Sequence, residues 1–206
     1  MPRIVCLSDA HGSYRKVKIP EGDVLILAGD MTRKGDLQDW IKLNEFLGTL
    51  PHLHKICVAG NGDYCFQEEP AKARKILSKA LYLQDEKTEL LGLKIYGSPW
   101  QPRFLDMAFN LERGTALQEV WAKIPVDTDI LITHCPPRGI LDKTALGQHI
   151  GCEELKARIE ELKLKLHVFG HVHESRGVLK QGETTFVNAA VSGLIWGKHE
   201  PFVVEL

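Results

Sequence analysis

Apolar positions along the chain fall into short runs separated by longer amphipathic stretches. The runs predict six strands, at about Arg3–Ser8, Asp23–Ala28, Lys55–Ala59, Lys94–Ser98, Asp129–Thr133 and His167–Gly170. The second and fifth runs are almost uninterrupted, through Val24-Leu25-Ile26-Leu27 and Ile130-Leu131-Ile132. Such continuity is typical of strands that are covered on both faces. We therefore expect these two strands to lie in the interior of the protein.

Helical periodicity appears between the strands. It predicts helices over Leu37–Leu50, Glu69–Ala80, Thr115–Ile124 and Cys152–Lys165. Towards the end, Arg176–Leu179, Thr184–Asn188 and Phe202–Leu206 read as short strands separated by turns at Gln181-Gly182 and Ser192-Gly193, which predicts antiparallel pairs. The whole pattern indicates an α/β protein with two packed sheets and helices outside them. Without repeats or a linker, residues 1–206 are expected to form a single domain.

Composition narrows the class of protein. The 206 residues are 44% hydrophobic and 26% charged, with a formal net charge of -1. This balance is typical of a soluble globular domain, and it argues against duplex nucleic acid or an anionic membrane as a partner. The five cysteines have no disulfide-framework spacing, and Met1-Pro2-Arg3 leads directly into the first strand. No apolar run approaches the ~18 residues of a membrane span, so we expect a cytoplasmic protein.

Polar side chains with ligand chemistry recur where the predicted strands end. They are Asp9, His11, Asp30, Asn61, His134, His171 and His173. Each has an ordinary explanation by itself: Asp30 as a turn or helix cap, Asn61 as a turn residue between glycines, His134 as a loop histidine. Their recurrence at the carboxyl ends of successive strands favours a shared ligand site. Carboxylate, carboxamide and imidazole together fit manganese, iron or zinc better than calcium or magnesium alone.

The same series resembles the calcineurin-like metallophosphoesterases in order and over essentially the whole chain. Gly97-Ser98-Pro99-Trp100, His134-Cys135-Pro136-Pro137 and Asn188-Ala189-Ala190 are similar to the metallophosphoesterase-domain-containing, cyclic nucleotide phosphodiesterase-like branch. The resemblance implies a four-layer α/β/β/α sandwich of two mixed sheets flanked by helices. It also implies two divalent metal ions, with manganese favoured and iron or zinc as alternatives. One ion would take Asp9, His11, Asp30 and His173, and the other Asp30, Asn61, His134 and His171, with Asp30 bridging.

Position 62 departs from the family pattern. Most members have a histidine after the asparagine, which acts beside the phosphate as the probable proton donor to the leaving oxygen, and this chain has Gly62. The next residue, Asp63, is retained, although it would normally orient the missing imidazole. Loss of a positioned acid typically costs about 10²–10⁴ in rate. Gly62 is either a natural substitution or an engineered replacement, and Asp63 without its partner favours the second explanation.

Other candidates for substrate contacts lie in the loops after the strands. Arg33 could reach a phosphate oxygen, Tyr64 and Trp100 could form an apolar wall, and His149 could replace the missing proton donor. Each has an alternative: a solvated arginine, core aromatics and a loop histidine. Asp142 and Lys143, on the same loop as His149, have unresolved roles.

The favoured function is a metal-dependent phosphoesterase that hydrolyses small phosphodiesters, with cyclic nucleotides as the preferred substrates and a hydroxide activated by the two metals as the nucleophile. Because of Gly62, we expect reduced activity. Two alternatives stay open, a nucleotide-binding protein with vestigial catalysis and a phosphoprotein phosphatase. The sequence predicts no oligomeric state.

Overall fold

The computed structural model describes residues 1–192 and 199–206, and most of its strands form two large sheets. The first sheet has the order β13 (Phe202–Glu205), β1 (Arg3–Leu7), β2 (Val24–Ala28), β3 (His54–Val58) and β4 (Leu81–Tyr82). The second has the order β11 (Gly177–Gln181), β12 (Thr184–Asn188), β10 (Leu166–Phe169), β9 (Ile130–Thr133), β6 (Leu93–Ser98) and β5 (Glu86–Leu90). A small parallel pair, β7 (Gln101–Pro102) and β8 (Asn110–Leu111), stands apart from both.

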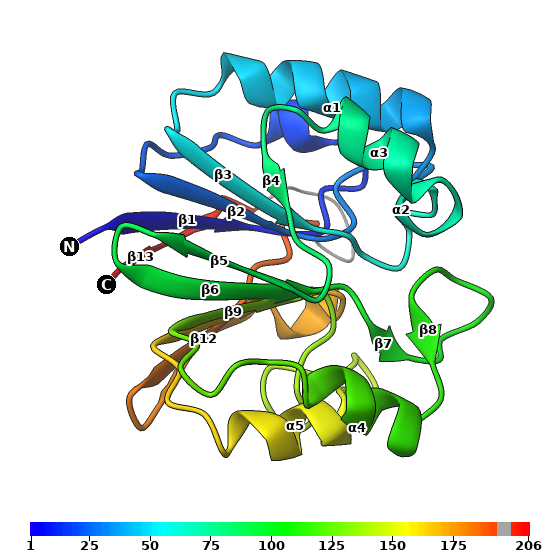
Figure 1. Ribbon diagram of the computed structural model, residues 1–206, viewed down its shortest axis with the longest axis vertical. Coiled ribbons are helices and arrows are strands. Elements are labelled where there is room, and N and C mark those ends of the chain that lie inside the picture. The colour runs from blue at the N-terminus through cyan, green and yellow to red at the C-terminus, as the bar shows by residue number, and fades with distance from the viewer. Residues whose placement is uncertain (193–198) are drawn as a thin grey trace.

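Helices cover the outer face of each sheet (Figure 1). They are α1 (Leu37–Thr49), α2 (Cys65–Glu68) and α3 (Pro70–Ile76) on the first sheet, and α4 (Thr115–Trp121) and α5 (Glu153–Ile159) on the second. The four-layer α/β/β/α sandwich expected from the sequence is therefore confirmed. Among the described residues, no helix combines the length and the apolar character that crossing a lipid bilayer requires.

Alternation along the strands explains why the apolar runs are continuous. In β1, Ile4 and Cys6 belong to the core between the two sheets, whereas Val5 and Leu7 belong to the core beneath α1. Successive side chains of a strand point to opposite faces, so a strand inside a four-layer sandwich needs apolar residues at every position. The same division holds in β2, where Ile26 faces the other sheet and Leu27 faces the helices.

Strand direction brings the site together. β1, β2 and β3 are parallel to one another, and so are β6, β9, β10 and β12. Each parallel set therefore ends at a common carboxyl edge, and the loops that follow carry the predicted ligands. An isolated bridge between Ser8 and Ala190 connects the ends of β1 and β12, which joins the edges of the two sheets.

Some elements differ from the sequence prediction. The helix predicted over Cys152–Lys165 spans only Glu153–Ile159, because the chain turns at Glu160 to enter β10. The edge strand β5 was missed because its sequence, EKTEL, is largely polar, and its pairing with β6 stabilises it. The final strands form antiparallel pairs as expected, β11 with β12 and β13 with β1, but β12 also runs parallel to β10. The predicted Ser192-Gly193 turn extends outside the described residues.

Candidate metal centre

Four of the predicted ligands have backbone conformations that side-chain-bearing residues rarely adopt. The φ angles of Asp9, His11, Asp30 and His171 are 54°, 44°, 52° and 70°. Left-handed conformations at residues other than glycine are uncommon, and strained residues of this kind cluster at functional sites. All four residues lie within a few positions of the end of a strand, where the other candidate ligands also lie.

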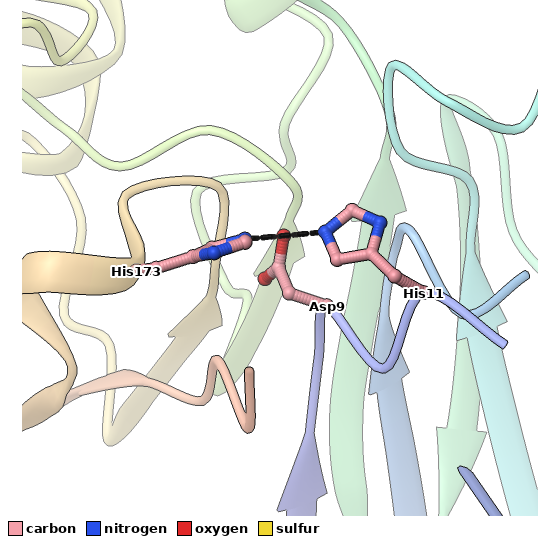
Figure 2. A group of neighbouring side chains, drawn as sticks. All are labelled: Asp9, His11 and His173. Carbon is pink, nitrogen blue, oxygen red and sulfur yellow. Dashed lines mark hydrogen bonds and ion pairs between the residues drawn. The ribbon is translucent and has the colours of Figure 1, made fainter. Parts of the chain in front are cut away.

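One group of candidate ligands consists of Asp9, His11 and His173 (Figure 2). The Nε2 atoms of His11 and His173 are 3.2 Å apart, and Asp9 Oδ1 lies 3.2 Å from His173 Nε2. Asp9 is almost fully buried, whereas the two histidines are partly exposed. A carboxylate oxygen and two imidazole nitrogens thus converge on one point that is open to solvent on one side.

The second group is fully buried and contains Asp9, Asp30 and His134. His134 Nδ1 donates to the Ala28 carbonyl at 2.9 Å, so in the neutral ring Nε2 carries a lone pair. That nitrogen faces Asn61 Oδ1 at 2.9 Å and Asp30 Oδ2 at 3.6 Å. Acceptors directed at one another repel unless a proton or a cation lies between them, so this donor set fits a divalent metal.

His171 completes the connection between the two groups. Its ring centroid is 5.1 Å from that of His134, and its backbone N–H donates to Asp9 Oδ2 at 3.0 Å. The structure thus brings all seven predicted ligands into one connected cluster. Asp9 is common to both groups, whereas the sequence analysis assigns the bridging role to Asp30. The division of ligands between two cations stays a prediction.

Electrostatics around the cluster favours metal binding. Burial would raise the pKa of Asp9, but the hydrogen bond from His173 and the neighbouring histidines outweigh it and hold that pKa below its usual value. Burial lowers the pKa of His11, and burial together with His134 lowers the pKa of His171 to about 3. An ionised carboxylate and neutral imidazoles are the protonation states that bind metals.

The pKa values of His134 and His173 are instead raised. Burial would lower the pKa of His134, but the charges of Asp30 and Asp9 outweigh it and raise that pKa. The hydrogen bond with Asp9 raises the pKa of His173. Both shifts report concentrated negative charge, which a bound cation would neutralise.

Asp63 has a structural task that the sequence analysis did not find. It is fully buried, and its Oδ2 accepts from the backbone N–H groups of Asp30 and Gly60 at 2.9 Å each, while Thr32 Oγ1 donates to its Oδ1 at 3.2 Å. Asp63 therefore fastens the loop after β2 to the loop after β3. Burial and the charge of Asp30 raise its pKa to about 7. These bonds give a reason to retain Asp63 although residue 62 is glycine.

Gly62 contacts the cluster through its backbone. Its N–H donates to Asp30 Oδ1 at 2.7 Å. A β-carbon at this position would lie 3.2 Å from the same oxygen, which is tight. The backbone there is not left-handed, so a larger residue needs only a small adjustment of Asp30.

Two serines that the sequence analysis missed hold Asp9 in place. Ser8 Oγ donates to Asp9 Oδ2 at 2.5 Å, and Ser192 Oγ donates to the Asp9 carbonyl at 2.5 Å. Beside them, a β-carbon on Gly170 would overlap both Asp9 Oδ2 and Ser8 Oγ. The Ser-Asp sequence at the end of β1 is the local signal for the first contact, but nothing local identifies Ser192.

The predicted substrate residues have different surroundings. Arg33 is exposed, and its β-carbon lies 3.0 Å from where a β-carbon on Gly12 would be, next to the loop that carries His11. Tyr64 precedes α2 and packs against the core beneath α1. Trp100 donates from Nε1 to Asp85 Oδ2 at 2.9 Å, and its ring packs edge-on against Phe109. Tyr64 and Trp100 are thus partly buried and pack against core residues, and their contact with a substrate stays a prediction.

His149 is held by Asp142 on the long loop after β9. Its Nδ1 lies 2.5 Å from Asp142 Oδ1, and the buried Asp142 also accepts at Oδ2 from the backbone N–H groups of Gly139 and Gly151, at 3.0 Å each. The loop is attached to the turn that carries His173, because Ser175 Oγ donates to the Lys143 carbonyl at 2.7 Å. Asp142 therefore both orders the loop and orients His149.

A sandwich of two sheets with an Asp, Asn and His cluster at their carboxyl edges defines a protein with a candidate dinuclear metal centre. The chain belongs to the calcineurin-like phosphoesterase family, whose model matches residues 2–175. It is 41% identical over 230 residues to the human metallophosphoesterase domain-containing protein 1, covering 99% of this chain and 71% of the relative. It is 43% identical over 211 residues to the UPF0046 protein C25E10.12 of Caenorhabditis elegans, covering 92% and 75%.

A solved structure shares the fold at low sequence identity. The crystal structure of TT1561 of Thermus thermophilus matches with a TM-score of 0.66 and 14% identity, covering 92% of this chain and 89% of that one. Family membership supports hydrolysis of phosphoester bonds with metal-binding residues.

Proposed function

We propose that this protein is a metal-dependent phosphodiesterase that hydrolyses small phosphodiesters, with cyclic nucleotides as the preferred class. The observation that carries the proposal is the cluster of seven Asp, Asn and His side chains at the edges of the two sheets, in a member of a phosphoesterase family. Two divalent cations bound there would stabilise the charge on the attacking and leaving oxygens of an in-line displacement at phosphorus.

The ligand set supports manganese as the preferred metal, with iron or zinc as alternatives. Asp9, His11 and His173 would hold one ion, and Asn61, His134 and His171 the other, with Asp30 next to both. Mixed carboxylate, carboxamide and imidazole ligation suits these metals. The backbone N–H of Gly62 keeps Asp30 Oδ1 in place and leaves Oδ2 on the side of His134.

The low net charge of the protein supports a small substrate. With a net charge of -1, the protein lacks the field that attracts a duplex polyanion. Arg33, exposed beside the loop that carries His11, is the cation we assign to a non-bridging phosphate oxygen. An arginine can bind a phosphate through two parallel N–H···O bonds, which would orient one phosphodiester group.

Protonation of the leaving oxygen is the step of the reaction that we expect to be slow. Residue 62 presents no side chain, and Asp63 is fully engaged by three donors. Diesters with good leaving groups, such as aryl esters, therefore lose less rate than unactivated diesters. His149, oriented through Nδ1 by Asp142, is the candidate replacement donor.

The decisive experiment is Gly62→His, with Gly62→Asn as a matched control that adds a polar side chain without an acid. Both variants are assayed with Mn²⁺ on bis-p-nitrophenyl phosphate and on 2′,3′- and 3′,5′-cyclic nucleotides. A gain of about 10²–10⁴ for histidine alone, larger on the cyclic nucleotides, is the expected result. In the original background, His149→Gln lowers the residual rate if His149 donates the proton.

A nucleotide-binding protein with vestigial catalysis is the second candidate, and Gly62 is the observation that favours it. Negligible turnover in Gly62→His, together with micromolar nucleotide binding and normal Mn²⁺ loading, would establish this alternative and refute the first. Activity on phosphopeptides that exceeds activity on every diester would instead indicate a phosphoprotein phosphatase.

The cellular location is proposed as cytoplasmic. All five cysteines are buried free thiols, which agrees with a reducing compartment.

A further inference from the structure

The segment between β7 and β8 extends to the candidate metal centre and contacts two of its ligands. The ring of Phe104 meets the ring of His171 edge-on, with centroids 5.7 Å apart and an interplanar angle of 87°. Met107 Sδ accepts from Asn61 Nδ2 at 2.9 Å, and the Ala108 N–H donates to the Asn61 carbonyl at 3.0 Å. In Figure 1 this segment lies on the side of the molecule away from the two termini.

The segment is held in one conformation by Asn110. Asn110 Oδ1 accepts from the Phe104 N–H at 3.0 Å and from Gln101 Nε2 at 3.1 Å, and its Nδ2 donates to the Leu105 carbonyl at 2.9 Å. Leu105 and Phe109 adopt left-handed conformations, with φ of 50° and 58°. Such strain persists only where surrounding contacts determine the conformation. These bonds fix the backbone that carries Phe104, and its ring contacts His171.

Phe104 nevertheless keeps 45% of its surface in contact with solvent. Trp100 and Phe109, on the same part of the chain, instead pack against each other. A half-exposed aromatic ring on an ordered backbone, next to the cluster of candidate ligands, can stack on a planar partner at a small cost of ordering.

We propose that Phe104 forms an apolar subsite for the aromatic group of a phosphodiester, either a nucleobase or an aryl ring, whose phosphate lies at the metal cluster. This inference rests on the proposed function and specifies its substrate class. Stacking on an aromatic side chain tolerates any planar ring, so the subsite selects aromatic over alkyl esters and discriminates little between bases.

Binding of two simple monoesters tests the subsite without turnover. Phenyl phosphate and methyl phosphate present the same anion to the Mn²⁺-loaded protein and differ in the group that would meet Phe104. In calorimetry, Phe104→Ala should reduce the preference for phenyl over methyl phosphate by about 10-fold. Phe104→Leu should lose most of that preference because it keeps apolar bulk without a ring, and Phe104→Tyr should retain it.

A matched control removes exposed apolar surface elsewhere. Leu53 is 82% exposed and directly precedes β3, at the opposite end of the strand from the cluster. Leu53→Ala should leave the phenyl-to-methyl preference at the wild-type value. Thermal unfolding and Mn²⁺ stoichiometry show whether each variant is folded and loaded.

Kinetics separates this inference from the proposed function. Bis-p-nitrophenyl phosphate and methyl p-nitrophenyl phosphate share a leaving group, so Phe104→Ala should reduce the ratio of their kcat/KM values about 10-fold, through KM. If neither diester is hydrolysed but phenyl selectivity depends on Phe104, the proposed function fails and the subsite stands. If Phe104→Ala changes binding of phenyl and methyl phosphate equally, or changes neither, the subsite is refuted.

Discussion

Replacing Asp63 by alanine tests how the loops after β2 and β3 are held together. The carboxylate is fully buried and accepts hydrogen bonds from the Asp30 and Gly60 backbone N–H groups and from Thr32 Oγ1. Alanine leaves all three donors without this acceptor. The bond from the Asp30 N–H to Asp63 also fixes the backbone of Asp30, whose φ of 52° is unfavourable without support.

The expected loss in the free energy of unfolding follows from these three donors. A buried donor that loses its partner costs about 1–3 kcal/mol, so the three together cost roughly 3–9 kcal/mol. Removing a buried carboxylate that Asp30 repels returns part of this, because burial and the charge of Asp30 both raise the pKa of Asp63. We expect a net loss of about 3 kcal/mol in the free energy of unfolding. Asp63→Asn keeps one oxygen for the two backbone donors and should cost about 1 kcal/mol.

Urea unfolding of the metal-free protein measures these differences, and calorimetry measures Mn²⁺ affinity. Asp63→Ala should weaken Mn²⁺ binding at least about 10-fold because Asp30 loses its support, an effect of the size seen when outer partners of metal ligands are removed. The fully exposed Asp106 provides the control Asp106→Ala, which should change neither quantity. The reasoning is refuted if Asp63→Ala stays within about 0.5 kcal/mol of wild type, the range of ordinary surface substitutions.

Three further predictions concern residues beyond Asp63. Burial lowers the pKa of His167 to about 3 from its ordinary value of 6.5, so the folded state binds fewer protons than the unfolded state between these values. The stability that is present above pH 6.5 is therefore lost as the pH falls towards 3, by up to ~1.4 kcal/mol per pH unit. In His167→Gln, the free energy of unfolding should depend less steeply on pH over this range. Asp142→Ala removes the acceptor of two backbone N–H groups and of His149, and should cost about 3 kcal/mol in chemical denaturation; a loss below 1 kcal/mol, roughly one ordinary hydrogen bond, would contradict that role. In Gly29→Ala, the new β-carbon would collide with His134 Nδ1, and the φ of 92° at this position is unfavourable for alanine. The variant should lose about 3 kcal/mol or more in the free energy of unfolding and should not bind Mn²⁺. Normal Mn²⁺ titration of this variant would overturn the packing argument.

Local pattern was sufficient for the elements that carry the ligands. The strand predicted at Asp23–Ala28 is Val24–Ala28, and the helix predicted at Leu37–Leu50 is Leu37–Thr49. These elements have strong periodicity, because each strand is buried on both faces and the helix covers one of those faces. The candidate ligands could be selected for the same reason, since each lies in a loop that follows a strand.

Contacts between distant segments had no such local signal. β5 exists because β6 lies beside it, and Phe104 reaches His171 because Asn110 shapes the loop that carries it. The sequence analysis left Trp100 open between an apolar wall of the site and a core residue, and in the structure that ring packs against Phe109. Aromatic residues in loops look alike in a sequence, and only long-range packing separates a core ring from an exposed one.

The sequence by itself determined the strands of the two parallel sets, the burial of the central strands and the seven polar side chains that follow their carboxyl ends. Periodicity and strand-end position are local properties, so the chain states them directly. The tertiary structure alone decided that Asp9 belongs to both ligand groups, that Asp63 joins two loops, and that Phe104 borders the cluster. These depend on distances between segments far apart in the chain, which are fixed only when the two sheets pack together.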